Sequence, residues 1–434
     1  MAIKLTEGIK KYTVNTGYLF LEKIARIIVT LTIWAIVVRY LGPEQYGIFS
    51  YAFSFVFLFS ILSDLGLNDI IVRDLITNKQ KEKLILGTAL FLKLLGSISA
   101  ILLIFISAYV FAIDHLSRIL ILIMSFRLFF QSFNHIDSYF QAEVMSKYSV
   151  YAKILSLVCT SILCLLFIHL KLPLIYFAIV VVAEAAVLAL GLTIFYITQK
   201  KIFPWRCNIA TAKDLLANSW PLALSIIAIS IYMRIDQIML KLMLDSASVG
   251  YYAAAVPISE SFYFVPLAIT GSLFPAIVKT KTKDNILYQN RIRALFSMLL
   301  WTGIAMAIFI TLISRPLVNI VYGQQYYPTA SVLSLHVWAS VFVFLGAAES
   351  KWILAENLQI YLMFYMIIGA VLNILLNFIL IPIWGINGAA ATTVFSQFFV
   401  VVAANLISKK TRPIFRLQME SLNLVKSLRH NISY

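Results

Sequence analysis

Apolar stretches of about 20 residues recur along the whole chain, and each is long enough to cross a hydrocarbon core of about 30 Å as a helix. Hydrophobic residues make up 61% of the 434 positions and charged residues 12%. A soluble domain is roughly half apolar and a quarter charged. No connection between the stretches is long enough to fold as a separate domain. The pattern therefore predicts an all-α polytopic membrane protein.

We predict about twelve transmembrane helices, six in each half of the chain. Their expected ranges are 17–38, 46–67, 84–112, 116–140, 150–170 and 174–198, then 215–240, 250–278, 294–314, 329–350, 359–381 and 387–408. This division gives an N-terminal six-helix bundle (1–198), a polar linker (199–213) and a C-terminal bundle (214–408). The tail (409–434) alternates cations with apolar residues, which is typical of an amphipathic helix on the inner membrane surface.

The net charge of +16 resides in short loops between the spans and not in a nucleic-acid recognition motif. No nucleic-acid partner is therefore expected. With the N-terminus placed in the cytoplasm, the cytoplasmic segments hold far more lysines and arginines than the outer loops. This bias predicts that both termini are cytoplasmic. The first 16 residues carry Lys4, Lys10 and Lys11 without a cleavage site, and they are expected to form a cytoplasmic surface helix.

Two pairs of matching segments indicate an internal repeat. RYLGPEQYGIFSYA, from Arg39, corresponds to KLMLDSASVGYYAAA, from Lys241, and FQAEVMSKY, from Phe140, corresponds to ILAENLQIY, from Ile353. Six spans separate the copies, so the repeat is parallel, and transporters built this way commonly bind substrate between their halves. Chance similarity between apolar helices is the alternative explanation.

Polar residues recur on one face of two predicted spans. The fourth span carries Arg127, Gln131 and Asn134, continued by Ser138 and Gln141, and the seventh carries Ser230, Arg234, Gln237 and Lys241. Such residues are costly in lipid, so these faces are expected to line a water-filled path or a seam between helices.

Arg26, Arg127 and Arg234 are candidate ligands for a phosphate-bearing substrate, because the guanidinium group binds phosphate through two parallel hydrogen bonds. The alternative is that the arginines balance nearby acids, as Glu22 does for Arg26 four residues away. Asp64, Asp236 and Glu260 are candidate ion-coupling acids, with structural ion pairs as the competing role.

No feature of the sequence indicates catalysis. The five histidines are scattered, no phosphate-binding loop is present, and Cys159, Cys164 and Cys207 have neither metal-ligand spacing nor a disulfide pattern. We expect no catalytic residue, no metal site and no cofactor.

Several short motifs occur in a consistent order along the twelve spans. They are Leu41-Gly42-Pro43-Glu44-Gln45-Tyr46-Gly47, Asp64-Leu65-Gly66-Leu67, Arg234-Ile235-Asp236, Val249-Gly250-Tyr251-Tyr252, Phe274-Pro275, Tyr322-Gly323 and Gly385-Ile386-Asn387-Gly388. In these the chain resembles the O-antigen flippase (Wzx) type of the polysaccharide-export branch within the multidrug/oligosaccharidyl-lipid/polysaccharide exporter superfamily.

The resemblance implies two six-helix bundles enclosing a V-shaped, cationic central cavity in a bacterial inner membrane. It also implies an undecaprenyl-pyrophosphate-linked oligosaccharide as substrate, moved from the cytoplasmic to the outer leaflet by alternating access. A proton or sodium ion, membrane lipids, and the polysaccharide polymerase and chain-length machinery are the implied partners.

Three alternatives stay open. A multidrug exporter of the same superfamily would favour an acidic cavity, whereas arginine is in excess here. A lipid II-type flippase often carries extra spans. A membrane glycosyltransferase or O-antigen polymerase usually carries a large outer loop, and the longest outer loop here, 315–328, is short.

Overall fold

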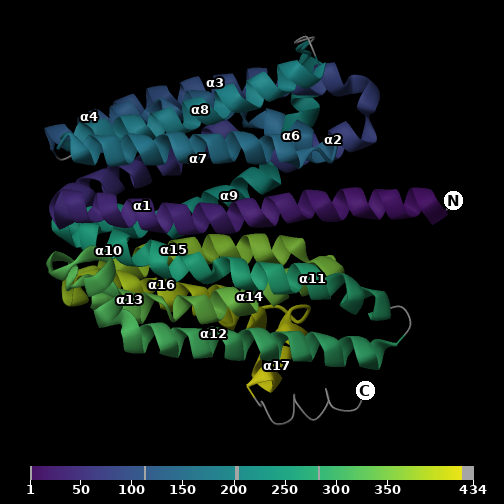
Figure 1. The fold of residues 1–434 in the computed structure, drawn as a ribbon. Helices are drawn as coiled ribbons and strands as arrows, with labels where there is room; N and C mark the ends of the chain where they lie inside the picture. Colours follow the sequence, from purple (N-terminus) through teal and green to yellow (C-terminus); the bar gives the residue numbers. More distant parts are fainter. Residues whose placement is uncertain (1, 112–113, 201–204, 282–283, 423–434) are drawn as a thin grey trace. The chain divides into compact units, whose positions relative to one another are not determined.

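The computed structural model describes residues 2–111, 114–200, 205–281 and 284–422. This part of the chain folds into seventeen α-helices and five 3₁₀ helices, with no strand among them (Figure 1). Eleven helical stretches are long and apolar enough to cross a membrane. The predicted all-α membrane fold is therefore confirmed.

The difference between eleven stretches and twelve predicted spans arises in α1 (Ala2–Asp64). Its apolar stretch runs on into α2 (Leu67–Thr77), so that Phe20–Thr77 spans 58 residues. At Gly42 the backbone leaves the helical region, with φ 73° and ψ 168°, and Pro43 follows. Glycine tolerates this conformation and proline has no N–H for a helical bond, so the chain turns between the first two predicted spans.

The N-terminal segment is helical. The α1 backbone is helical from Ala2 into the first span without a break. It is therefore continuous with that span, and its position at the cytoplasmic surface stays a prediction.

Seven other long helices correspond to predicted spans, although α12 extends well beyond its span at both ends and α16 ends at Val401, before the predicted end. They are α3 (Glu82–Phe111), α7 (Ser146–His169), α8 (Leu174–Lys200), α9 (Ile209–Met243), α12 (Asn285–Tyr322), α15 (Gln359–Trp384) and α16 (Ile386–Val401). The connecting 3₁₀ helices η1 (Lys79–Lys81), η4 (Gln324–Tyr326) and η5 (Ala403–Leu406) are short.

Three predicted spans are broken into shorter pieces. The fourth consists of α4 (His115–Ser125), α5 (Arg127–Gln131), η2 (Ser132–Asn134) and α6 (His135–Ala142). The eighth consists of α10 (Ser246–Glu260), η3 (Ser261–Tyr263) and α11 (Phe264–Lys281), and the tenth of α13 (Thr329–His336) and α14 (Ala339–Ala355).

The chain divides into two compact units. The first unit comprises Met1–Leu41 and Ile48–Ser230, and the second comprises Gly42–Gly47 and Ile231–Tyr434. The division falls inside α9 and not at the predicted linker (199–213). The reason is close packing: a Cβ added to Gly66 would lie 2.8 Å from the backbone nitrogen of Ala223, so the first part of α9 lies against the end of the second span.

Each unit is a bundle of helices that lie side by side. In the first unit α3, α4, α7 and α8 are neighbours, and in the second α12, α14, α15 and α16 are neighbours (Figure 1). The core of the first unit includes the fully buried Leu67, Phe140 and Leu192.

The matching segments of the two halves adopt matching conformations. After Glu143 the chain turns through Val144 at φ 54°, and after Glu356 it turns through Asn357 at φ 58°. Each glutamate also pairs with a lysine that follows the corresponding earlier span: Glu143 with Lys79 at 3.3 Å, and Glu356 with Lys281 at 2.8 Å. This correspondence supports the internal repeat.

The tail forms a helix, α17 (Arg412–Ser421), that packs against protein. Its apolar Ile414 and Leu417 are buried, and α17 contacts α12. The Gln418 amide donates to the Val401 carbonyl at 2.7 Å. The amphipathic helix predicted for the tail is present in this part, but its apolar face covers the second unit instead of lipid. The rest of the predicted tail helix (423–434) lies outside the described residues.

Candidate functional site

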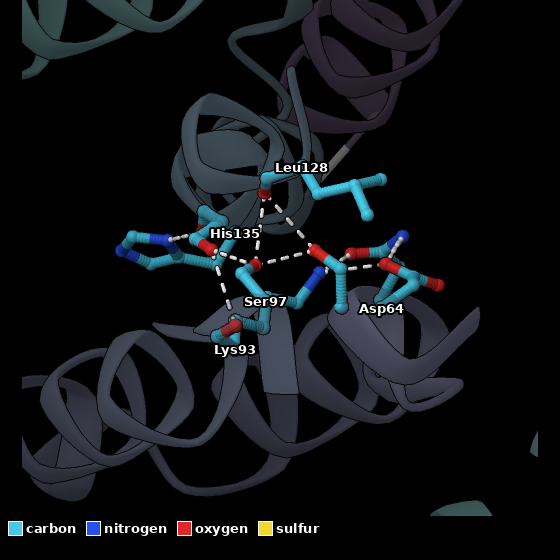
Figure 2. Close-up of polar contacts among 8 residues, drawn as sticks. Asp64, Lys93, Ser97, Leu128 and His135 are labelled. Carbon is cyan, nitrogen blue, oxygen red and sulfur yellow. Dashed lines mark hydrogen bonds and ion pairs between the residues drawn. The ribbon is translucent and has the colours of Figure 1, made fainter. Parts of the chain in front are cut away.

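A charged network lies where α1 ends and α2 begins, beside α3. The Lys93 ammonium group donates to Asp64 at 2.7 Å and to the side-chain oxygen of Asn68 at 2.6 Å (Figure 2). The Asn68 amide also donates to Asp64, at 2.8 Å. The Lys93 side chain is 1% exposed and that of Asp64 is 33% exposed. Lysine therefore balances the charge of Asp64, which agrees with the structural ion pair considered for this acid.

Hydroxyl groups connect this network to the broken fourth span. Ser63 and Ser97 both donate to the Leu128 carbonyl, at 3.1 and 2.9 Å, and Ser97 also bonds to Ser132 at 2.7 Å (Figure 2). The Leu128 carbonyl is available because the N–H of Ser132 bonds to Phe129 instead, as the helix changes to 3₁₀ geometry. The break thus fixes the fourth span against α1 and α3.

Beside this network the first unit contains a cavity of about 250 Å³, which we name the Arg127 cavity. Four predicted site residues line it: Asp64, Arg127, Gln131 and Asn134. Asn68 and Ser230 contribute to the same wall. The Arg127 guanidinium lies over the Phe53 ring, 4.8 Å from its centroid, a geometry that favours a cation at this position. The structure therefore brings the polar face of the fourth span to a cavity.

In the second unit Asp236 is buried within a cluster of uncharged hydrogen-bond donors. Its carboxylate accepts from the Tyr252 hydroxyl at 2.6 Å, from the Thr393 hydroxyl at 2.8 Å and from the Asn377 amide. These donors come from α10, α16 and α15. The side chain of Asp236 is 2% exposed, so four helices of one bundle meet at this carboxylate.

The other predicted site residues lie in different surroundings. Gln237 is buried next to Asp236, and Arg234 interacts electrostatically with Glu260. Arg26 bonds to Glu22 at 2.7 Å and lies 3.6 Å from Glu184. Two acids therefore surround Arg26, which favours the alternative that this arginine balances acids.

Sequence reasoning left several members of these clusters out of the predicted site, namely Asn68, Lys93, Tyr252, Asn373, Asn377 and Thr393. One signal was present: Asn373 and Asn377 are four residues apart in a strongly apolar span, and the structure joins them by a 3.1 Å hydrogen bond. Among the described residues no three His, Cys, Asp or Glu side chains are close enough to hold a metal ion.

The fold is similar to that of solved transporters. An inward-facing multidrug resistance MATE family transporter of the MOP superfamily aligns with a TM-score of 0.71 and 15% identity, over 92% of this chain and 96% of that chain. The lipid II flippase MurJ, in an inward closed conformation, aligns with a TM-score of 0.71 and 16% identity, over 94% and 91%. The chain therefore has the helical membrane fold of these two proteins.

Sequence comparison identifies the family. A family model described as "Polysaccharide biosynthesis protein" matches residues 13–281. The capsular polysaccharide biosynthesis protein CapF of Staphylococcus aureus is 22% identical over 405 residues, which are 90% of this chain and 97% of that protein. The chain belongs to the polysaccharide biosynthesis protein family.

Proposed function

We propose that the protein is a flippase that moves an undecaprenyl-pyrophosphate-linked oligosaccharide from the cytoplasmic to the outer leaflet of a bacterial inner membrane. Membership of the polysaccharide biosynthesis protein family supports a sugar-bearing substrate, and the similarity of the fold to a lipid II flippase supports a mechanism by alternating access. The V-shaped central cavity expected from the family resemblance stays a prediction.

One observation carries the proposal: an arginine and two amide side chains of the fourth span line the Arg127 cavity. Lys93 pairs with Asp64, and Arg127 contributes its guanidinium group to the lining of the same cavity. Gln131 and Asn134 add uncharged donors on the same face. An anionic pyrophosphate is attracted to such a wall, because arginine and amide N–H groups bind phosphate oxygens. We assign the binding of the pyrophosphate to Arg127, Gln131 and Asn134 in the first unit. Arg234 and Gln237 are assigned the same role in the second unit.

Asp236 is the best-placed candidate for an ion-coupling acid. Its carboxylate, the Thr393 hydroxyl and the Asn377 amide supply oxygen ligands of the kind that hard cations prefer. The same cluster also suits a proton, because Tyr252, Thr393 and Asn377 provide a complete set of uncharged partners. Asp64 and Glu260 are weaker candidates, since a cation lies beside each.

Complementation tests the proposed function. The chain is expressed in a bacterium that lacks its own O-antigen or capsule flippase, and surface polysaccharide is measured. We expect Arg127→Ala and Arg234→Ala to reduce the restored polysaccharide at matched protein levels in the membrane. Wild-type activity of both variants would remove the arginines from the substrate path.

The multidrug exporter is the alternative that a separate experiment addresses. If deletion of the gene leaves the polysaccharide of the source organism unchanged and raises its sensitivity to cationic drugs, the exporter function replaces the flippase. A lipid II-type flippase predicts loss of cell-wall synthesis on deletion instead.

A further inference from the structure

A second cavity of the first unit adjoins the Arg127 cavity. It measures about 150 Å³, and we name it the Asp137 cavity. Asn68 and Asn134 line both cavities. Shared wall residues make the two cavities neighbours, so one ligand of sufficient length can occupy both. Asn68 is held in place by its bonds to Lys93 and Asp64, which makes the shared wall rigid.

The two cavities differ in charge. Asp69, Asp137 and Lys153 are the charged side chains of the Asp137 cavity. Lys153 is paired with Asp137 at 2.8 Å, so the remaining charge is negative. A pyrophosphate is repelled by such a wall but attracted to Arg127. The charge distribution therefore excludes a second phosphate site.

The wall of the Asp137 cavity has the chemistry of a site for hydroxyl groups. Besides the charged residues it contains the amides of Asn68, Asn134 and Gln141 and the hydroxyl of Ser138. The carboxylate oxygen of Asp137 that does not bond to Lys153 is buried and accepts no hydrogen bond within the described part of the chain. Carboxylates and carboxamides together offer both acceptors and donors, which matches hydroxyl groups that act as both.

We propose that the Asp137 cavity binds the sugar residue next to the pyrophosphate, while the Arg127 cavity binds the pyrophosphate itself. This inference rests on the proposed function and assigns the neutral, polyhydroxylated part of the substrate to residues of α2, α6 and α7. Asn134, which lines both cavities, lies where the sugar joins the phosphate. Asp69, Asp137 and Gln141 thereby become determinants of sugar specificity.

Binding by the purified full-length protein in detergent separates the two cavities. The probes are bare undecaprenyl pyrophosphate and the same carrier bearing one neutral hexose or N-acetylhexosamine, taken from a panel of such sugars. The test variant is Asp69→Ala combined with Gln141→Ala, since both side chains are exposed and neither is needed for the core. Asp137 is not substituted, because Lys153 would lose its partner. Gln359→Ala, an exposed glutamine at the start of α15, is the matched control.

We expect the wild type and the control to bind at least one sugar-bearing carrier about tenfold more tightly than the bare carrier, as expected for two or three added hydrogen bonds. The double variant should lose this preference and keep its affinity for the bare carrier. Arg127→Ala should weaken binding of both carriers and keep the preference.

Three results overturn the inference while the flippase function stands. In the first the double variant keeps its preference for the sugar-bearing carrier, and in the second it binds both carriers more weakly by the same factor. The third result is a wild type that binds the bare and the sugar-bearing carriers equally well. If the wild type binds no carrier at all, the proposed function itself fails. If a lipophilic cation competes with the bare carrier for the wild type and this competition is lost in the double variant, the acids of the Asp137 cavity belong to a drug exporter.

Discussion

Lys93 is a buried cation with two oxygen partners, Asp64 and Asn68. Replacing it by methionine keeps most of the volume and leaves Asp64 without its counter-charge. We expect Lys93→Met to lower the free energy of unfolding by about 1–3 kcal/mol, since a buried partner is lost but Asp64 keeps some access to water. Thermal unfolding in detergent measures this. The loss should shrink when Lys93→Met is combined with Asp64→Asn, and strictly additive effects would contradict the pairing.

Asp236 accepts hydrogen bonds from Tyr252 and Thr393 on one oxygen and from Asn377 on the other. In Asp236→Asn the shape is kept but the negative charge is lost. We expect transport in proteoliposomes to stop responding to an imposed sodium or proton gradient, while the protein still inserts and unfolds cooperatively. Asp64→Asn serves as the comparison, because Lys93 already balances that carboxyl. An unchanged gradient response in Asp236→Asn would exclude this acid from coupling.

Periodicity alone was enough to predict part of the site. Arg127, Gln131 and Asn134 recur at helical spacing, and the structure places all three on one cavity. Partners from distant spans were not predictable, because Lys93 meets Asp64 across 29 positions and Thr393 meets Asp236 across 157. For Arg26 one partner was predictable and one was not. The pairing with Glu22 follows from their spacing of four residues, whereas the sequence does not indicate the pairing with Glu184.

The starts of the second and eighth spans contact each other through matching glycines. A Cβ on Gly47 would lie 1.7 Å from the Ser246 carbonyl oxygen, and one on Gly250 would lie 1.9 Å from the Pro43 carbonyl oxygen. Alanine at either position therefore forces the backbones apart. We expect Gly47→Ala and Gly250→Ala each to cost about 1–3 kcal/mol of stability, measured as a lower midpoint of thermal unfolding.

Gly271 provides the control for these two substitutions. It lies in α11, and an added Cβ there would meet nothing within 4 Å. Gly271→Ala should leave stability unchanged or raise it by up to about 1 kcal/mol, since alanine is the better helix former. Equal losses at all three positions would show that the close contact is not the cause.

Helix breaks were predictable only where the residue type causes them. Gly42 and Pro43 mark the turn after the first span. The interruption of the fourth span between Ser125 and His135 contains neither glycine nor proline. There the cause is tertiary: hydroxyl groups of Ser63 and Ser97 bind the Leu128 carbonyl that a regular helix would use itself. No local pattern encodes such a break.

Hydropathy predicted the order of the apolar helices and their approximate positions, because each must cover the same hydrocarbon thickness. The boundary between the compact units was not predictable in this way. A polar stretch between apolar spans suggested a linker at 199–213, yet the first unit continues to Ser230. The packing of Ala223 against Gly66 keeps the first part of α9 in the first unit. The composition of the segments around these two residues does not indicate this contact.

The orientation in the membrane rests on the distribution of lysine and arginine, and native Cys207 gives direct access to it. Cys207 is exposed in the segment between α8 and α9, whereas Cys164 is buried. With both termini in the cytoplasm, a membrane-impermeant maleimide should label Cys207 in inside-out vesicles and leave it unlabelled in intact cells. Cys159→Ser with Cys164→Ser removes the other thiols from the measurement.

The opposite side is tested by one added thiol. Gln324 is exposed in η4, between the ninth and tenth spans, which the same charge rule places outside. Gln324→Cys, in a background with the three native cysteines replaced by serine, should be labelled in intact cells. The two positions lie on segments separated by three spans, 215–240, 250–278 and 294–314, and an odd number of crossings must put them on opposite sides. Labelling of both from the same side would mean that one of these three spans does not cross the membrane.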